Sequence, residues 1–316
     1  MNIFDNIPDT KDIFNYPVLT IGNFDGLHIG HKRIIQKLIS VSDEKGRDHI
    51  VITFKQHPRS VIFPGSKFEY LLTRDEKLDE LRKLGIKNVI MMDFDFALSR
   101  MSPVDFVNKI LISRIGVSAI VMGYDHSFGR KREGNIDNLV ALSANNFELF
   151  HIEPEISGDH PVSSTRIRNE LHKGNVDESA LLLDKFYYLN GAVVKGEQRG
   201  RKMGFPTANV GLIDETKVIP GDGVYAVHVR IADDKKTYSG MCNIGYNPTF
   251  GNTNKTVEVN IFDFDRDIYE EKIHVEFIEK VRDEIKFNSL DDLMKQLFAD
   301  NEHIRYICSR SRNKAE

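Results

Sequence analysis

A short apolar run that ends in closely spaced glycines constrains this chain more than any other feature. Residues 17–21 suit a buried strand, and Gly22, Gly26 and Gly30 break the run into a tight turn. Downstream, apolar residues recur at helical spacing, which predicts a helix over about 29–41 with one face packed on a sheet. This part of the chain therefore reads as a strand, a glycine-rich turn and a helix.

Alternating strand and helix patterns fill the rest of the first half. Apolar runs rich in valine and isoleucine occur at 49–54, 88–94, 118–124 and 147–156, with helical patterns between them at 73–84, 102–115 and 135–145. Such alternation predicts a parallel sheet and a doubly wound, Rossmann-like α/β domain. Thr73 with Glu76 forms a capping box, and Ser102 followed by Pro103 marks another helix start.

The second half changes to short, closely spaced strands. They are expected at 187–195, 224–231, 237–244, 256–264 and 272–280, after a helix near 176–184 and before a helix at 289–307. This pattern predicts a small antiparallel β-barrel with a C-terminal helix, so the fold class is α/β plus all-β. No repeat or low-complexity linker separates the halves, and we place the domains at residues 1–184 and 185–316.

Length and composition exclude several classes of protein. A chain of 316 residues fits two domains, and 41% hydrophobic with 28% charged residues is typical of a soluble globular protein. The absence of a long apolar run and of a secretory leader predicts a cytoplasmic protein that does not bind a membrane. A net charge of −4 argues against nucleic acid as a partner. Cys242 and Cys308 are far apart, so we expect inert thiols, neither a disulfide nor a zinc site.

Two histidines stand at the start of the first helix. His28 and His31 are three positions apart, so both imidazoles face one way at a helix N-terminus, which attracts phosphate through its free N–H groups and its dipole. Ligands of doubly wound sheets bind outside the carboxyl ends of the strands, which is where this turn lies. The alternative is a pair of surface histidines, but the preceding glycine turn favours a nucleotide phosphate site.

A later segment, PVSSTRIRNEL, opens another helix. Ser163 or Ser164 can cap it, and Arg166 and Arg168 lie in its first turns. Cations at a helix N-terminus oppose the helix dipole, so we interpret the two arginines as facing a bound anion; a solvated charged helix is the alternative.

The second half carries its own polar constellation in GEQRGRKMGFPTAN. Gly200 and Gly204 belong to a basic loop that can fold over phosphates, although a hairpin turn with solvated charges fits as well. Thr207 and Asn209 lie two apart in an extended segment, so their oxygens share a face and could ligate Mg²⁺. Glu258 lies within a predicted strand, where a carboxylate is usually solvent-facing.

The first half resembles the nucleotidyltransferase superfamily. Its signature HxGH corresponds to residues 28–31, GNFDG flanks it, and SSTRIR resembles the family's SSTxIR motif. GYDHSFG resembles a third element, but His126 and Ser127 replace its usual aromatic and basic residues. The resemblance implies nucleotide- or flavin-binding roles for Gly22, Asn23, Phe24, Asp25, Gly26, Gly123, Asp125, Ser163, Ser164 and Thr165.

The second half resembles the riboflavin kinase module, and the whole chain is similar to the bacterial bifunctional FAD synthetases. GxxxGxPTAN, GVYAV, NIGYNPTFG and VEVNIFDFDRDIYEEKIHVEF carry this resemblance. It implies phosphorylation of riboflavin to FMN and adenylylation of FMN to FAD, with riboflavin, FMN and ATP as substrates. Thr207 and Asn209 would hold Mg²⁺, Glu258 would be the kinase base, and Gly200, Gly204 and Pro206 would cover ATP. His28, His31 and Arg168 would serve adenylyl transfer.

Other functions stay open on the sequence. The chain could be another small-molecule adenylyltransferase, or a flavin-binding regulatory protein with relic catalytic sites. The absence of a KMSKS-like loop argues against an amino-acid-activating enzyme. Product formation from riboflavin and ATP separates these possibilities. For the assembly state we expect a monomer or a weak homo-oligomer.

Overall fold

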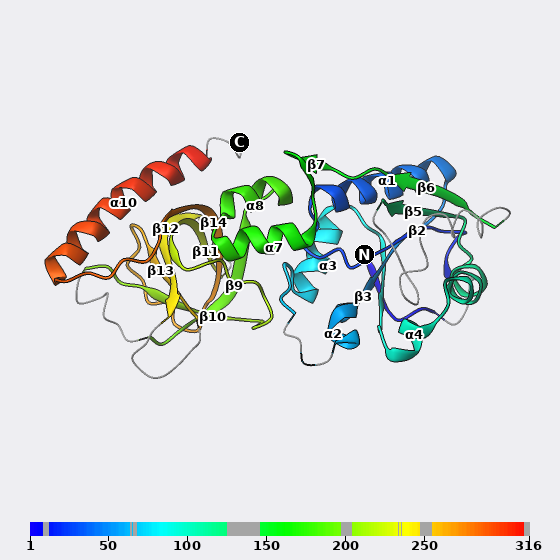
Figure 1. Ribbon diagram of the computed structural model, residues 1–316, viewed down its shortest axis with the longest axis horizontal. Coiled ribbons are helices and arrows are strands. Elements are labelled where there is room, and N and C mark those ends of the chain that lie inside the picture. Colours follow the sequence, from blue (N-terminus) through cyan, green and yellow to red (C-terminus); the bar gives the residue numbers. More distant parts are fainter. Residues whose placement is uncertain are drawn as a thin grey trace. The chain divides into compact units, whose positions relative to one another are not determined.

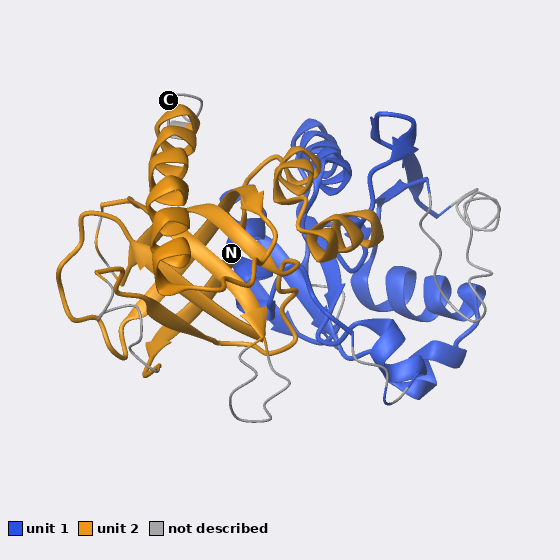
Figure 2. Ribbon diagram, turned by 60° about the vertical axis from the view of Figure 1, so that its left-hand side comes forward, with its two compact units in different colours: residues 1–164 blue, residues 165–316 orange. Residues whose placement is uncertain are grey.

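The computed structural model describes residues 1–8, 13–63, 65, 68–124, 146–196, 204–232, 234, 236–246 and 255–312. The chain divides into two compact units, residues 1–164 and 165–316, which Figure 2 distinguishes by colour. Each unit is described by itself.

Unit 1 is built on a six-stranded parallel sheet. Its strands are β1 (Asn2–Asp5), β2 (Val18–Ile21), β3 (His49–Phe54), β4 (Asn88–Met92), β5 (Ala119–Gly123) and β6 (Glu148–Ile152). They lie in the order β1-β4-β3-β2-β5-β6, and every pair is parallel (Figure 1). The doubly wound sheet predicted from the alternating pattern is therefore confirmed. Successive strands move outward in opposite directions from β2 and β5, so the carboxyl end of β2 lies at the switch point where such sheets bind ligands.

Helices cover the sheet. They are α1 (Ile29–Lys45), α2 (Pro58–Ile62), α3 (Arg74–Lys83), α4 (Phe96–Arg100), α5 (Pro103–Asp105) and a π-helix, η2 (Phe106–Ile115). Helix η2 buries Val107, Leu111 and Ile115 against strand residues such as Leu19 and Ile50. Helix α1 buries Ile35, Leu38 and Val41, as its predicted apolar stripe requires.

Most predicted boundaries in unit 1 agree with the structure, and the differences have local causes. The capping box of Thr73 and Glu76 is present, and Ser102 caps a helix with Pro103 at its start. The helix predicted over 102–115 instead continues as a π-helix, in which the Ser113 hydroxyl donates to the Asn108 carbonyl, five residues back. The run predicted as one strand over 147–156 ends at Ile152, and a hairpin of β7 (Ile156–Ser157) and β8 (His160–Pro161) follows. The helix predicted at 135–145 lies outside the described residues.

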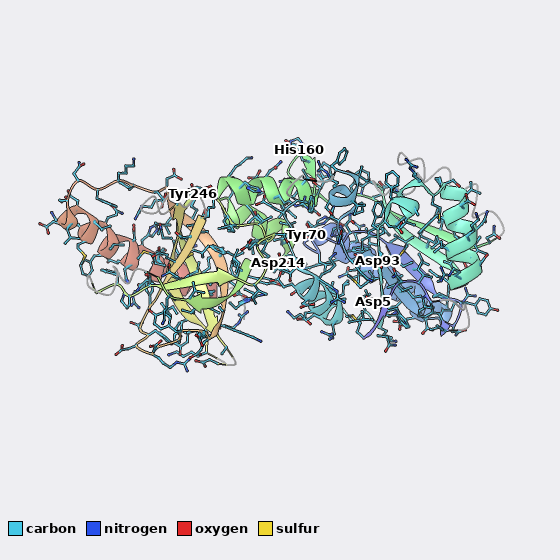
Figure 3. The ribbon with its side chains drawn as sticks, turned by 90° about the horizontal axis from the view of Figure 1, so that it is seen from below. Asp5, Tyr70, Asp93, His160, Asp214 and Tyr246 are labelled. Atoms are coloured by element: carbon cyan, nitrogen blue, oxygen red, sulfur yellow. The ribbon has the colours of Figure 1, made fainter. Side chains whose placement is uncertain are left out.

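The first strand, β1, is absent from the sequence prediction. It pairs with β4 at the edge of the sheet and is mostly exposed, so it lacks the apolar pattern of the inner strands. Asp5 and Asp93, which Figure 3 labels, both contact the ammonium of Lys55, at 3.4 and 3.0 Å. These ion pairs join three neighbouring strand ends.

Unit 2 is a closed antiparallel barrel with helices packed on it. Its strands are β9 (Tyr187–Val194), β10 (Ala208–Leu212), β11 (Gly223–Ile231), β12 (Tyr238–Tyr246), β13 (Lys255–Ile261) and β14 (Lys272–Arg282), in the order β10-β13-β12-β11-β14-β9. Helix α10 (Leu290–Arg312), red in Figure 1, buries Ile304, Ile307 and Cys308 on the barrel wall. The predicted barrel and terminal helix are confirmed; the prediction treated β10 only as an extended segment.

Two further helices precede the barrel: α7 (Ser164–Lys173), which belongs to unit 2 from Thr165 on, and α8 (Val176–Leu183). The N–H of Gly221 donates to the Leu171 carbonyl at 2.8 Å, which fastens the end of α7 to the loop before β11. Helix α8 packs on β14 and buries Leu182 and Leu183. Compactness therefore groups residues 165–184 with the barrel, whereas the sequence places the functional boundary at 184/185; that boundary stays a prediction.

Candidate active sites

The glycine-rich turn connects β2 to α1 in a strained conformation. The N–H of Gly22 continues the ladder by donating to the Ile52 carbonyl at 3.0 Å. Gly26 then has φ 87°, while Phe24 and Leu27 have φ 48° and 45°, in a region that side-chain-bearing residues rarely adopt. Both side chains are buried, which holds the backbone in place. Strain of order 1–3 kcal/mol at such a residue is typical of ligand-binding turns.

His28 and His31 form one stacked pair at the start of α1. His28 is the N-cap residue, and its Nδ1 accepts a hydrogen bond from the backbone N–H of His31 at 3.4 Å. The two rings stack with centroids 3.7 Å apart and an interplanar angle of 18°. The ring of Phe24 meets His31 edge-on at 5.2 Å. The structure therefore brings together the two histidines that the sequence predicted.

Burial keeps both imidazoles uncharged. It lowers the pKa of His28 to about 4, against an opposing effect of the Asp25 carboxylate. Burial, followed by the His28 ring and the Lys77 ammonium, holds the pKa of His31 well below its usual range. Because Nδ1 of His28 accepts a hydrogen bond, its proton belongs on Nε2, which makes Nε2 a donor. The pair is therefore uncharged near neutral pH, and the Nε2 N–H of His28 is a neutral donor.

Asp25 is a structural anchor within the turn. Its carboxylate accepts hydrogen bonds from the backbone N–H groups of Leu71 and Leu72, at 3.0 to 3.1 Å. Its carbonyl accepts one from the Ser164 hydroxyl at 2.8 Å. Asp25 therefore ties the turn to the segment before α3 and to Ser164, the last residue of unit 1. Among the predicted binding residues, this one holds the shape of the site.

Lys77 is a buried cation that the sequence analysis missed. Its side chain, in the first turns of α3, is 6% exposed, and Nζ lies 3.4 Å from the Thr53 hydroxyl. Thr53 in turn donates to the Asn23 carbonyl at 3.2 Å. Burial lowers the pKa of Lys77, while Asp25 raises it. The sequence gave little indication that Lys77 is buried, because a lysine beside Leu78 in a highly charged helix normally faces solvent.

Aromatic rings gather beside the same turn. The Asn23 amide lies 3.2 Å from Nε2 of His57, and His57 stacks on Phe68 at 3.8 Å. The backbone N–H of His57 donates to the hydroxyl of Tyr70, which Figure 3 labels, at 3.0 Å. Phe68 and Tyr70 meet edge-on at 5.0 Å. The residues come from separate loops, so sequence spacing gave no indication of the cluster.

The start of α7 carries the remaining predicted residues. The helix begins at Ser164, directly after Ser163, and Ser164 contacts the turn through Asp25. Arg166 forms an ion pair with Glu178 at 2.7 Å, so its charge has a partner within the protein, and the anion expected at this helix start stays a prediction. Thr165 and Arg168 belong to unit 2, and their relation to the histidine pair stays a prediction. Gly123 ends β5, and Asp125 lies outside the described residues.

The barrel brings the second constellation together on two paired strands. Asn209 of β10 and Glu258 of β13 are direct cross-strand partners, and the Thr207 hydroxyl lies 3.4 Å from a Glu258 carboxylate oxygen. Pro206 is fixed by its carbonyl, which accepts a hydrogen bond from the Asn260 amide at 2.7 Å. Gly204 is described, with φ 79°, and Gly200 lies outside the described residues. Three of the predicted oxygen-bearing side chains therefore share one site.

A close approach at Gly196 supports a role for Asn209 as a ligand. A Cβ atom at Gly196 would lie 2.0 Å from the Asn209 amide nitrogen, so only glycine leaves room for this side chain. Hydroxyl, amide and carboxylate oxygens are the donors that Mg²⁺ prefers. Among the described residues, no group of three or more His, Cys, Asp or Glu side chains could hold a metal ion.

Comparisons with known proteins assign both units. A family model described as FAD synthetase matches residues 11–166, and one described as riboflavin kinase matches residues 183–308. A curated protein of Listeria monocytogenes, called bifunctional riboflavin kinase/FMN adenylyltransferase, is 35% identical over 91% of each chain. Its namesake in Bacillus subtilis is 33% identical over 92% of each chain.

A solved structure has the same fold along nearly the whole length. A Streptococcus pneumoniae protein named macrolide-efflux protein aligns with a TM-score of 0.87 and 31% identity, covering 96% of this chain and 99% of that one. Its name describes an activity that neither family model shares. In the part of the chain that the structure describes, no helix is both long and apolar enough to cross a membrane.

Proposed function

The chain belongs to the family of bifunctional riboflavin kinase/FMN adenylyltransferases, and we propose that its two sites work by different chemistry. It synthesises flavin cofactors: riboflavin is phosphorylated by ATP to FMN, and FMN is adenylylated by a second ATP to FAD. The observation that supports the kinase assignment most directly is the cross-strand pairing of Asn209 with Glu258, with the Thr207 hydroxyl beside the Glu258 carboxylate.

In the barrel, Glu258 acts as a general base. The 5′-hydroxyl of riboflavin attacks the γ-phosphorus of ATP, a new P–O bond forms, the bond to the β-phosphate oxygen breaks, and ADP leaves. The hydroxyl proton passes to the Glu258 carboxylate, because an alcohol is a poor nucleophile while protonated. Thr207 hydrogen-bonds to this carboxylate and orients it.

Thr207 and Asn209 would hold Mg²⁺ in this site. When bound, the ion neutralises charge on the ATP phosphates. The oxygen donors fit the metal, and Gly196 leaves the Asn209 side chain the space that this role needs. Gly204 and Pro206 precede the strand that carries Asn209, and we assign both residues to ATP binding.

At the turn, catalysis needs no base. The FMN phosphate is already largely dianionic, with a second pKa near ~6, and its oxygen attacks the α-phosphorus of ATP as pyrophosphate leaves. The N–H groups at the start of α1 and the Nε2 donor of His28 stabilise the charge that builds on the phosphates. We propose that His31 and Arg168 help to stabilise the same phosphate charge. We also propose that Gly22, Asn23 and Gly26 let the backbone of the turn approach the nucleotide closely.

One incubation tests both activities. The full chain is mixed with riboflavin, ATP and Mg²⁺, and FMN, FAD, ADP and pyrophosphate are resolved over time. FMN with ADP should appear first, followed by FAD with pyrophosphate. The absence of both flavin products would contradict the proposal, and omission of Mg²⁺ tests its requirement. We propose that the enzyme works in the cytoplasm as a monomer or weak homo-oligomer, on small molecules and without nucleic acid or membrane partners.

A further inference from the structure

Lys77 brings a positive charge beneath the catalytic turn without reaching the protein surface. Its ammonium lies 3.4 Å from the Thr53 hydroxyl, and Thr53 holds the carbonyl of Asn23, a residue of the turn itself. The side chains of Lys77 and Thr53 are 6% and 0% exposed. A buried ammonium is costly unless something compensates for its lost hydration. A lysine in this position is therefore not a solvated surface charge.

Asp25 supplies a compensating negative charge from within the turn. Its buried carboxylate stabilises the charged form of Lys77 and also that of His28. Lys77 in turn acts on His31, where its charge opposes protonation together with the His28 ring. Four titratable groups from α1, α3 and the turn thus act on one another. The next titratable group beside the turn is His57, whose Nε2 lies 3.2 Å from the Asn23 amide.

We propose that Lys77 is a positioning residue for adenylyl transfer, one that supports the turn and the stacked histidines through Thr53 and Asn23 and brings a fixed positive charge into this cluster. The inference rests on the proposed adenylyltransferase function of this site. Lys77 does not need to touch the nucleotide. It acts through His31, through Asp25 and through the Thr53 bridge to Asn23.

An uncharged pair is required by the observed geometry. Protonation of His28 at Nδ1 would replace the acceptor of the N–H of His31 by a second donor, and the cap of α1 would break. Nδ1 of His31 is buried and has no hydrogen-bond partner among the described residues, so a proton there would carry an unsatisfied charge. Without Lys77 we expect His31 to gain a proton at higher pH, and the acid limit of the reaction to rise with it.

A set of variants separates the effect of the Lys77 charge from the effect of its side-chain shape. Lys77→Met removes the charge and keeps the length of the stem, whereas Lys77→Arg retains a positive charge. Lys83→Met, at the exposed end of the same helix, is the matched control. Lys77→Gln replaces Lys77→Met if the latter fails to fold. Riboflavin phosphorylation by the same full chain reports whether each variant is intact.

Two readouts are measured for each variant: the pH profile of FAD formation from FMN and ATP between pH 5 and 9, and histidine titration in the unliganded protein by ¹⁵N NMR. For Lys77→Met we expect kcat/KM to fall by about 10-fold to 100-fold, as for a misplaced site. The acid limb and the His31 titration should both move up by about one pH unit, the size of effect that one nearby charge produces. Lys77→Arg should keep kcat/KM and the two pH values much closer to those of the wild type, because it retains the positive charge.

The outcomes separate the inference from the function on which it rests. If Lys77→Met lowers the rate but leaves the acid limb and the His31 titration where they are in the wild type, Lys77 is only structural and the inference is overturned. A downward shift overturns it as well. If the folded wild type forms no FAD from FMN and ATP, the proposed function fails instead, while the NMR titration still shows whether Lys77 acts on His31.

Discussion

The Nδ1 atom of His28 lies 3.4 Å from the backbone nitrogen of His31, and the two rings stack 3.7 Å apart. The same hydrogen bond therefore caps α1 and fixes which ring nitrogen of His28 carries its proton. Helix capping and the supply of a phosphate donor are the same local feature, so a substitution at His28 changes both.

His28→Ala should abolish most FAD formation and leave FMN formation nearly unchanged. The variant removes the Nε2 donor, and the loss of one such donor costs roughly 100-fold to 1000-fold in turnover. FAD formation from FMN and FMN formation from riboflavin are measured separately. His160→Ala, in the β7–β8 hairpin, is the control and should retain both rates. Equal losses in both reactions for His28→Ala would point to a folding defect.

Stability should fall in weak acid because His28 is buried uncharged. The unfolded chain takes up this proton near the ordinary pKa of 6.5, whereas the folded protein does so only at about 4. Between these values the unfolded state binds more protons, so the free energy of unfolding decreases as pH falls, by about 3 kcal/mol for this group. The contribution of His28 to the free energy of unfolding is complete above pH 6.5, and it is lost as the pH falls through about 4.

Urea unfolding followed by circular dichroism at several pH values measures this dependence. His28→Ala should weaken it between pH 6.5 and 4, because the alanine variant has no proton to take up at that position. The His160→Ala control should keep the wild-type slope. An unchanged slope in His28→Ala would mean that other groups dominate acid unfolding.

The sequence allowed prediction of what neighbouring residues determine. The strand, glycine turn and helix around His28 lie within about 30 residues, and the capping box of Thr73 and Glu76 is a three-residue signal. The β-barrel followed from strand spacing. In each case the sequence pattern lies within the same segment as the structure that it predicts. No contact with a distant segment had to be known.

Contacts between distant segments account for what the sequence did not show. Burial of Lys77 depends on Thr53, 24 positions earlier, and on Asp25. Strand β1 is defined by its pairing with β4; for example, the side chains of Asn2 and Asn88 bond across 86 positions. The ion pair between Arg166 and Glu178, 12 positions later, was likewise not visible in the sequence. Charge and pattern alone do not reveal a partner that folding supplies.

Glu258→Gln should greatly reduce riboflavin phosphorylation. The amide retains the size of the side chain but cannot accept the hydroxyl proton, and loss of a general base costs about 100-fold to 10000-fold in rate. Supplied FMN should still become FAD at close to the wild-type rate. Glu279→Gln, an exposed carboxylate on β14, is the matched control. Normal phosphorylation by Glu258→Gln would leave Glu258 as an ordinary barrel carboxylate.

Gly196→Ala should weaken the proposed metal site in the barrel. The added Cβ would lie 2.0 Å from the Asn209 amide nitrogen, so the Asn209 side chain must move. We expect the Mg²⁺ concentration for half-maximal riboflavin phosphorylation to rise by about 10-fold, as when a metal ligand is misaligned. Excess Mg²⁺ should restore part of the rate, and FAD formation from FMN should not change. A loss that Mg²⁺ does not relieve would argue against Asn209 as a ligand.

Two fragments test where the kinase domain begins. The sequence predicts that residues 185–316 alone phosphorylate riboflavin, because the strand pattern changes at 185. In the structure, α7 and α8 are bonded to and packed on the barrel, and Leu171, Leu182 and Leu183 are buried. Removing these helices exposes the apolar surface of the barrel that they cover. Full burial of a leucine stabilises the folded state by about 1.5–3 kcal/mol.

We therefore expect residues 165–316 to be active and clearly more stable than residues 185–316, with the shorter fragment still able to phosphorylate riboflavin at low temperature. Thermal unfolding by circular dichroism and FMN formation are measured for both. Equal melting temperatures would show that α7 and α8 contribute little to the barrel. A shorter fragment that is folded but inert would instead place the functional boundary before residue 185, because residues 165–184 would then be required for catalysis and not only for stability.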